Sequence, residues 1–207
     1  MPESAEEVYA RVVAAVGPDG RLPMSQSGKW DIFPWEAVDG DVVPKVLRPP
    51  SDEPERWGAD DASEKTCDTC AGVDPASVVW EDDRWLLTHP GAPSGLPLVL
   101  VLRTREHLDY PELDDGLATE LGRISVRLVR IMEHLPHVGR AHTSRWGDGG
   151  AHCHVWFLAR TEGLTGVLGS PALEWDDVLP PVPEDIWRAD LHAVATRLAN
   201  WGGTARA

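Results

Sequence analysis

The sequence predicts an α+β fold, in which an antiparallel sheet of about five strands has a long helix packed on it. Two observations lead to this fold class. Leu98–Leu102 is a continuous apolar run, as expected of a central strand covered on both faces. Apolar residues then recur every three or four positions from Leu113 to Leu135, which predicts a long helix with one buried face. A helix and a hairpin are expected before this core, and a further helix after it.

The first element is expected to be a helix over residues 4–16. Ser4 and Glu7 have the spacing of a capping box, in which each side chain bonds the other residue's backbone N–H. Valines follow at helical spacing, and Gly17 can end the helix. The segment therefore predicts an amphipathic helix that precedes the core.

A hairpin is expected next. Lys29–Glu36 and Val42–Leu47 are interpreted as its two strands, and Asp39-Gly40 between them suits a two-residue turn. Residues 48–65 are acidic and rich in proline, which indicates an ordered crossing loop or a linker.

The remaining elements complete the sheet and its cover. Pro111 is expected to open the long helix, because proline at the first helical position loses no hydrogen bond. A last helix is expected over Pro183–Trp201. We divide the chain into residues 1–65, a core at 66–165 and an extension at 166–207, all in one globular unit. The other strands are expected at Val78–Trp80, Arg84–Leu87, Arg140–Trp146 and His152–Leu158.

Composition narrows the class of partner. The 207 residues include 34 acidic and 19 basic ones, for a net charge of −15. This charge argues against a nucleic-acid duplex or an anionic membrane as partner, because both select basic surfaces. No apolar run approaches the roughly 20 residues of a membrane span. With no basic-then-apolar leader and only three cysteines, the chain is expected to be cytoplasmic.

The residues that most strongly suggest chemistry lie on the last predicted strand. Alternate side chains of a strand share a face, so His152, His154 and Trp156 are expected to project together. Cys153 is then expected to point into the core as a small apolar residue. The alternative is that these histidines are ordinary residues of a half-buried strand.

Cys67-x-x-Cys70 indicates half of a zinc site or a redox pair. A redox pair would open a helix, and residues 71–75 are a poor helix start. Two further ligands are needed for zinc, and His107 and His152 lie near predicted strand ends. Such a site would be closed and hence structural. A pair of cysteines without metal stays an alternative.

Glycines precede the histidine strand in the run Gly147-Asp148-Gly149-Gly150. Glycines allow backbone N–H groups to approach phosphate oxygens closely, as in anion-binding nests. We therefore regard Gly149 and Gly150 as candidates for ligand binding. A flexible hairpin loop is the alternative interpretation.

The run from Cys67 to Arg160 resembles the histidine-triad (HIT) superfamily, which includes nucleotide hydrolases and galactose-1-phosphate uridylyltransferase. The resemblance implies a HIT-like sheet and a structural zinc ion held by Cys67, Cys70, His107 and His152. The matching parts are Cys67-x-x-Cys70, the long helix, Arg105-Glu106-His107-Leu108, and Gly149-Gly150-Ala151-His152-Cys153-His154-Val155-Trp156-Phe157-Leu158-Ala159-Arg160.

By the same resemblance, the chain is a nucleotidyl transferase or a nucleotide hydrolase, and His154 is the nucleophile. Its imidazole would attack the α-phosphorus of a small nucleotide or nucleotide sugar and form a nucleotidyl-histidine intermediate. The resemblance also implies a homodimer. His142, Ser144 and His89 are candidates for contacts with the substrate, with ordinary surface residues as the alternative.

Trp156 departs from the family pattern, which has a third histidine or a glutamine at this position. An indole offers one N–H donor and no titratable proton, so it cannot act as a general acid. Transfer or hydrolysis with a good leaving group is compatible with this change, and release of a basic amine is not favoured. The alternative is a non-catalytic or repurposed nucleotide-binding protein.

Overall fold

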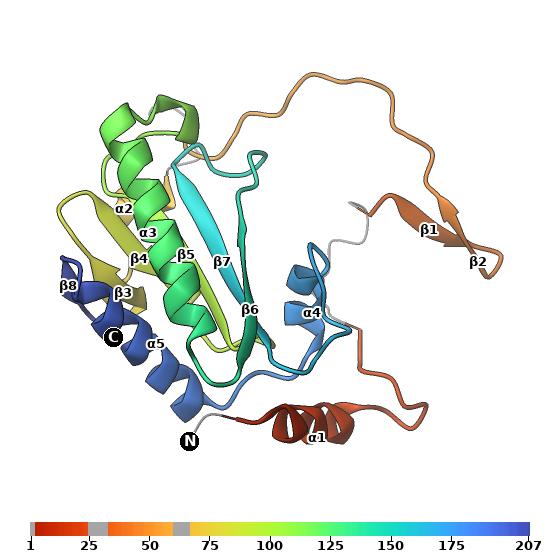
Figure 1. Ribbon diagram of the computed structural model, residues 1–207. Coiled ribbons are helices and arrows are strands. Elements are labelled where there is room, and N and C mark those ends of the chain that lie inside the picture. Colours follow the sequence, from red (N-terminus) through yellow and green to blue (C-terminus); the bar gives the residue numbers. More distant parts are fainter. Residues whose placement is uncertain (1–2, 25–32, 60–66) are drawn as a thin grey trace.

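The computed structural model describes residues 3–24, 33–59 and 67–207, and its α+β architecture confirms the predicted fold class (Figure 1). A six-stranded antiparallel sheet has the order β6-β7-β5-β4-β3-β8. The sixth strand was not predicted, because two residues carry no alternation pattern. The strands are β3 (Val78–Glu81), β4 (Trp85–Thr88), β5 (Leu98–Thr104), β6 (Val138–Ser144), β7 (His154–Thr161) and β8 (Thr204–Ala205).

The side chains of the central strand β5 alternate between the two faces of the sheet. It pairs with β4 on one side and β7 on the other, as its apolar sequence predicts. Leu98, Leu100 and Leu102 are fully buried in the larger core cluster. Side chains alternate along a strand, so Val101 and Arg103 lie on the opposite face. We call this second side the open face.

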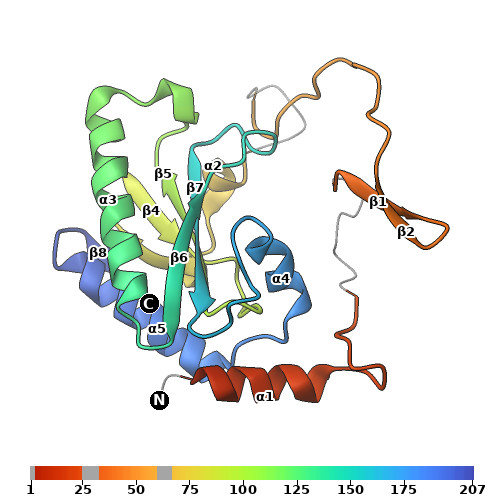
Figure 2. The same ribbon diagram turned by 45° about the vertical axis from the view of Figure 1, so that its right-hand side comes forward.

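Two helices cover the first face (Figure 2). They are α3 (Asp115–Glu133), whose apolar stripe packs on the sheet as predicted, and α5 (Glu184–Ala199). The expectation that Pro111 opens α3 is wrong. Pro111 lies in the 3₁₀ turn η3 (Tyr110–Glu112), and the side chain of Asp114 accepts a hydrogen bond from the N–H of Leu117 and caps α3.

The open face is partly covered by α4 (Ala172–Val178) and the loops around it. Leu158 and Val99 pack there with Leu179, which closes this end of the open face. Asp176 of α4 accepts a hydrogen bond from the N–H of Leu96 at 2.7 Å. The other end of the open face, near the start of β7, is left for the site described below.

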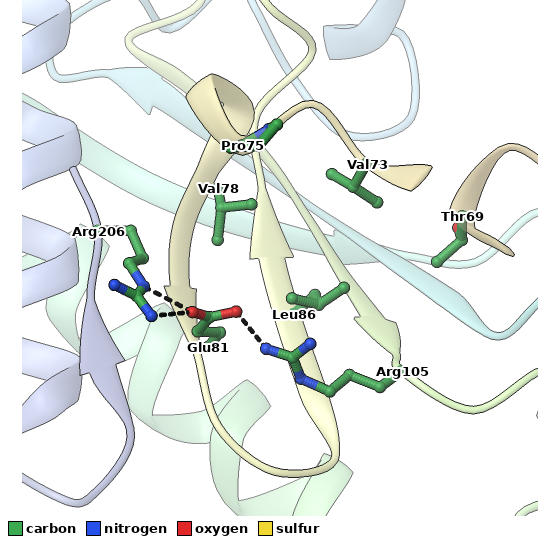
Figure 3. A pocket seen from close by; sticks show the side chains of 8 residues that line it. All are labelled: Thr69, Val73, Pro75, Val78, Glu81, Leu86, Arg105 and Arg206. Atoms are coloured by element: carbon green, nitrogen blue, oxygen red, sulfur yellow. Dashed lines mark hydrogen bonds and ion pairs between the residues drawn. The ribbon is translucent and has the colours of Figure 1, made fainter. Parts of the chain in front are cut away.

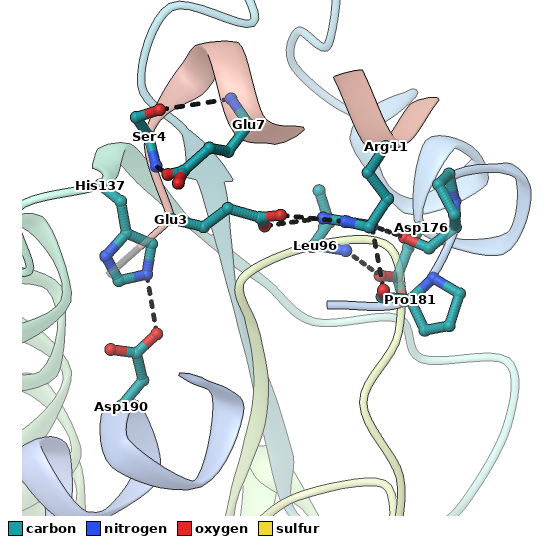
Figure 4. A network of polar contacts seen from close by, with 10 residues as sticks. Glu3, Ser4, Glu7, Arg11, Leu96, His137, Asp176, Pro181 and Asp190 are labelled. Carbon is teal, nitrogen blue, oxygen red and sulfur yellow. Dashed lines mark hydrogen bonds and ion pairs between the residues drawn. The ribbon is translucent and has the colours of Figure 1, made fainter. Parts of the chain in front are cut away.

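Helix α1 (Ala5–Ala15) begins with the predicted capping box at Ser4. Arg11 pairs with Glu3 and donates to the carbonyl oxygens of Pro180 and Pro181 (Figure 4). These bonds fasten α1 to the segment between α4 and α5.

A hairpin of β1 (Trp35–Val38) and β2 (Asp41–Pro44) lies apart from the main sheet in Figures 1 and 2. Its turn is the predicted one, with φ of 53° at Asp39 and 93° at Gly40. The predicted strand residues 29–32 lie outside the described part of the chain, as do residues 60–65 of the crossing segment. Within the described part, no helix has the length and apolar character that a membrane span requires.

A candidate metal centre and an adjoining cavity

Four side chains converge at the end of the sheet where β5 finishes and β7 begins. Cys67 and Cys70 come from the short helix α2 (Asp68–Gly72) and the residue before it, and His107 and His152 come from loops. One ligand atom from each of the four lies within 4.8 Å of the others. The structure therefore brings together the four predicted metal ligands.

The distances suit a tetrahedral ion. Nδ1 of His152 lies 3.2 Å from Sγ of Cys67 and 3.7 Å from Sγ of Cys70, and Nδ1 of His107 lies 3.3 Å from Sγ of Cys70. Ligands around a tetrahedral zinc ion, with bonds of about 2.0–2.3 Å, are separated by roughly 3.3–3.8 Å. The donor set of two thiols and two imidazoles is also the one zinc prefers.

His152 is prepared for a metal by its surroundings. The Nε2–H of its ring points away from the cysteines and donates to the carbonyl oxygen of Thr104 at 2.7 Å. Nδ1, which faces the cysteines, therefore keeps its lone pair for a metal. The residue is 5% exposed, and burial lowers the pKa of its imidazole. The lowered pKa favours the neutral ring, which is the form that binds metals.

His154 is the first residue of β7 and lies directly across from Arg103 of β5. Its Nδ1–H donates to the carbonyl oxygen of His152 at 2.7 Å. This bond fixes the ring and leaves Nε2 with a free lone pair. The orientation is the one required of a nucleophilic imidazole.

A cavity of about 260 Å³ opens beside the four-ligand cluster, and both His154 and Trp156 line it. The ring of Trp156 meets that of Trp146 edge to face, with centroids 6.2 Å apart. The predicted Gly149 and Gly150 also line the cavity. The other lining residues are Trp57, Cys67, Asp68, Thr69, Val101, Arg103 and His152.

The glycine loop is held by the segment that precedes the cysteines. The N–H of Trp57 donates to the carbonyl oxygen of Gly149 at 3.1 Å, and the N–H of Ala151 donates to that of Trp57 at 2.8 Å. Arg56 donates to the carbonyl oxygen of Gly150 at 2.6 Å and pairs with the carboxylate of Asp109. This part of the crossing segment is therefore a wall of the cavity rather than a linker.

Asp109 anchors this wall. Burial alone would raise the pKa of its carboxyl, but hydrogen bonds from Arg56 and from the N–H of Tyr110, together with the charges of Arg56 and Arg145, hold the pKa below its ordinary value. This contact could not be predicted from local sequence patterns, because Arg56 and Asp109 are 53 residues apart.

Arg103 is a second residue that sequence reasoning missed. It follows the apolar run of β5 and shares the open face with Val101, so its parity relative to that run was the available signal. Burial lowers the pKa of its guanidinium, while electrostatic interaction with Asp68 and Cys67 acts in the opposite direction. Its Nη1 donates to Oγ1 of Thr69 at 3.2 Å.

A larger cavity, of about 480 Å³, lies farther across the same face (Figure 3). Glu81 lies at its edge between Arg105 and Arg206 and pairs with both guanidinium groups. Register places Glu81, Leu86, Arg103 and His154 in one row across β3, β4, β5 and β7. Thr69 of α2 lines both cavities, so α2 lies between them.

Comparisons with solved structures find several likenesses, among them the following three. A hypothetical histidine triad nucleotide-binding protein from Sulfolobus tokodaii has a TM-score of 0.48 and 14% identity, and the match covers 65% of this chain and 93% of that one. A zinc-bound histidine triad family protein from Mycobacterium smegmatis has a TM-score of 0.44 and 16% identity, with 57% and 84% covered. A Hit-like protein involved in cell-cycle regulation from Bartonella henselae, solved with an unknown ligand, has a TM-score of 0.43 and 11% identity, with 58% and 85% covered.

The chain is similar to histidine-triad proteins. No protein-family model and no curated protein matches its sequence.

Two other residues that the sequence suggested as substrate contacts lie on β6 beside β7. Ser144 lies across from Trp156 in the β6–β7 pairing, and His142 lies across from Leu158. Neither is among the residues that line the cavity. Their predicted contacts with a substrate stay predictions.

His89 lies elsewhere. Its Nε2 faces the carbonyl oxygen of Ala76 at 3.2 Å, its Nδ1 accepts from the N–H of Gly91, and its ring meets that of Trp187 of α5. The structure does not bring His89 to the cavity. Cys153 is 1% exposed in the core, as its alternation predicts, and burial raises the pKa of its thiol to about 11.

Proposed function

We propose that this chain is a nucleotidyl transferase or nucleotide hydrolase that acts on the α-phosphate of a small nucleotide or nucleotide sugar through His154. The observation that carries the proposal is the orientation of His154. Its Nδ1–H is bound to the carbonyl oxygen of His152, so Nε2 is available to a phosphorus atom in the cavity that His154 lines. The residues that resemble the histidine-triad pattern support the same role.

In the first proposed step, Nε2 of His154 attacks the α-phosphorus. A nitrogen–phosphorus bond forms, and the bond from phosphorus to the bridging oxygen breaks, so the leaving group departs with the electron pair. In the second step, water or another acceptor attacks the same phosphorus. The nitrogen–phosphorus bond then breaks, the acceptor's proton passes to solvent, and the neutral imidazole is restored. Two displacements thus replace one difficult displacement.

Trp156 limits which leaving groups this site serves. It follows His154 on the same face of β7 and lines the cavity with it. Its indole has no titratable proton to give to a departing atom. We therefore propose leaving groups that are stable as anions, such as phosphates, and not amines.

The four-ligand cluster is proposed to hold a structural zinc ion through Cys67, Cys70, His107 and His152. A bound zinc ion with four protein ligands supplies a fixed crosslink and no open coordination position. Because His152 contributes its side chain to this cluster and its carbonyl oxygen to His154, the cluster also positions the proposed nucleophile.

Phosphorus NMR of the full chain with a nucleotide panel tests this proposal. The panel contains nucleotide sugars with a sugar phosphate acceptor, dinucleoside polyphosphates and nucleoside diphosphates. We expect turnover by the wild type and none by His154→Ala, with unchanged turnover by His192→Ala, whose ring lies on α5 and contacts the carbonyl oxygen of Ala207. The products distinguish a transferase from a hydrolase.

Full activity of His154→Ala on the true substrate would refute the mechanism. Binding of nucleotides without turnover by either protein would favour the second candidate function, a nucleotide-binding protein. The observation that favours this candidate is Trp156, which lines the cavity and has no titratable proton where the family pattern has a histidine or a glutamine.

A further inference from the structure

Arg103 lines the cavity but has no role in the two proposed displacement steps. It is the sixth residue of β5 and lies directly across from His154, so the two side chains share the open face. Both line the cavity of about 260 Å³. A guanidinium therefore lies beside the imidazole that faces the cavity.

The bonding of Arg103 is incomplete within the described residues. Nη1 donates to Oγ1 of Thr69, but Nε is buried and has no hydrogen-bond partner among them. Asp68 attracts the guanidinium electrostatically, yet Arg103 forms no ion pair with a carboxylate of the described ranges.

Neighbouring arginines differ from Arg103 in this respect. Arg56, on the wall of the cavity, is paired with Asp109, and Arg105, two residues farther along the chain, is paired with Glu81. Their charges are compensated by the protein itself. Among the arginines of the described ranges, Arg103 is the one that lines the cavity beside His154.

A half-buried guanidinium without a paired carboxylate is unfavourable for folding, because the attraction of Asp68 and Cys67 offsets only part of its desolvation. A ligand that carries an anionic oxygen would offset it. Planar guanidinium groups bind phosphate oxygens with two parallel hydrogen bonds, which adds geometric selection to the charge.

We infer that Arg103 binds an anionic phosphate oxygen of the ligand in this cavity, and so makes the site selective for phosphate-bearing ligands over their neutral counterparts. The choice of nucleotides as ligands rests on the proposed function, whereas the binding of an anion does not. Arg103 supplies a fixed positive charge that Trp156 does not.

Binding measurements by calorimetry on the full chain loaded with zinc test this inference. The probes are adenosine and uridine 5′-monophosphates, the two parent nucleosides, and inorganic phosphate. For at least one pair, wild-type protein is expected to bind the monophosphate more tightly than the nucleoside. Arg103→Met is expected to weaken monophosphate binding about 10- to 100-fold, the usual value of a hydrogen bond to a charged group, with nucleoside affinity unchanged. Arg103→Lys keeps the charge and is expected to restore part of the loss.

Arg105→Met is the matched control, because it removes the same charge two residues farther along the same segment. Arg105 lines the larger cavity and not the one beside His154. It is expected to leave the preference for phosphate unchanged. The melting temperature gives a second readout: Arg103→Met should melt at the same temperature as the wild type or higher, since a buried, unpaired charge has been removed. Inorganic phosphate should raise the melting temperature of the wild type but not of Arg103→Met.

Three results would overturn the inference. These are the absence of any preference for phosphate in the wild type, an unchanged preference in Arg103→Met, and an equal loss of monophosphate and nucleoside binding with a lower melting temperature. The last result would mean that Arg103 only supports the fold. If the preference depends on Arg103 but the wild type turns over no nucleotide, the inference stands and the proposed function fails.

Discussion

Asp109→Asn removes the charge that fixes one wall of the cavity. In the folded chain, Asp109 accepts hydrogen bonds from Arg56 and Arg145, and Arg56 in turn donates to the carbonyl oxygen of Gly150. Without the carboxylate charge, Arg56 stays partly buried without its paired counter-ion. We expect the glycine loop and the segment at Trp57 to loosen, and the free energy of unfolding to fall.

The size of the effect follows from burial. The side chains of Asp109 and Arg56 are 14% and 29% exposed. Breaking a fully buried pair costs about 3–5 kcal/mol, and an exposed pair contributes at most about 1 kcal/mol. We therefore expect a loss of about 2–3 kcal/mol, which lowers the melting temperature of a chain of this size by about 5–10 °C.

Urea unfolding and amide hydrogen exchange measure this loss. The amides of Trp57 and Ala151, which bond across the wall, should exchange faster in Asp109→Asn. The control is Glu184→Gln on α5, whose pair with Arg188 is 63% and 67% exposed and should contribute about 0.3–0.5 kcal/mol.

The loss should also depend on pH. The folded-state pKa of Asp109 is held below its ordinary value of 3.8, so its stabilising contribution is complete above that value. The contribution is lost as pH falls through the lower, folded-state pKa. The difference between wild type and Asp109→Asn should therefore narrow at acid pH. A loss no greater than that of Glu184→Gln, with unchanged amide exchange, would refute the reasoning.

Two further predictions concern the metal and a turn. Wild-type protein purified without chelator should contain about one zinc ion per chain by metal analysis. Cys67→Ala should lower both the zinc content and the melting temperature, because metal binding is coupled to folding. Wild-type protein without zinc would contradict this prediction. Gly203→Ala should lower the free energy of unfolding, measured in urea, by about 2–4 kcal/mol, since φ is 74° and a Cβ would lie 2.5 Å from Cζ2 of Trp80. A Cβ at Gly202 would meet nothing within 4 Å, so Gly202→Ala should lower the free energy of unfolding less. Equal decreases in the two variants would exclude the clash with Trp80 as the cause.

The local parts of this fold could be predicted from the sequence. The capping box at Ser4, the Asp39-Gly40 turn and the apolar run of β5 each depend on neighbouring residues, and the structure has all three. Pro111 was assigned to the wrong element because two N-terminal signals compete there. Asp114, three residues later, has the side chain that caps α3.

The candidate site was predictable where residue type alone restricts the chemistry. Two cysteines at i and i+3, with two histidines near strand ends, leave few roles other than metal binding, and the structure brings their ligand atoms together. Arg103 and Arg56 were not predictable in the same way. An arginine has many ordinary roles on a surface, and only the pairing of β5 with β7 and the path of the crossing segment place these two beside the cavity.

The short helix α2 contributes residues to the candidate metal centre and to both cavities. It has five residues, no side-chain cap at its start and no buried residue, so its own hydrogen bonds cannot hold it in place. It contributes Cys70 to the four-ligand cluster, and its Thr69 lines both cavities. An ion that orders α2 would therefore change the affinity for any ligand touching Thr69, and by reciprocity the ligand would change the affinity for the ion by the same factor. A chelator added to the complex would then compete with the ligand without ever entering its cavity.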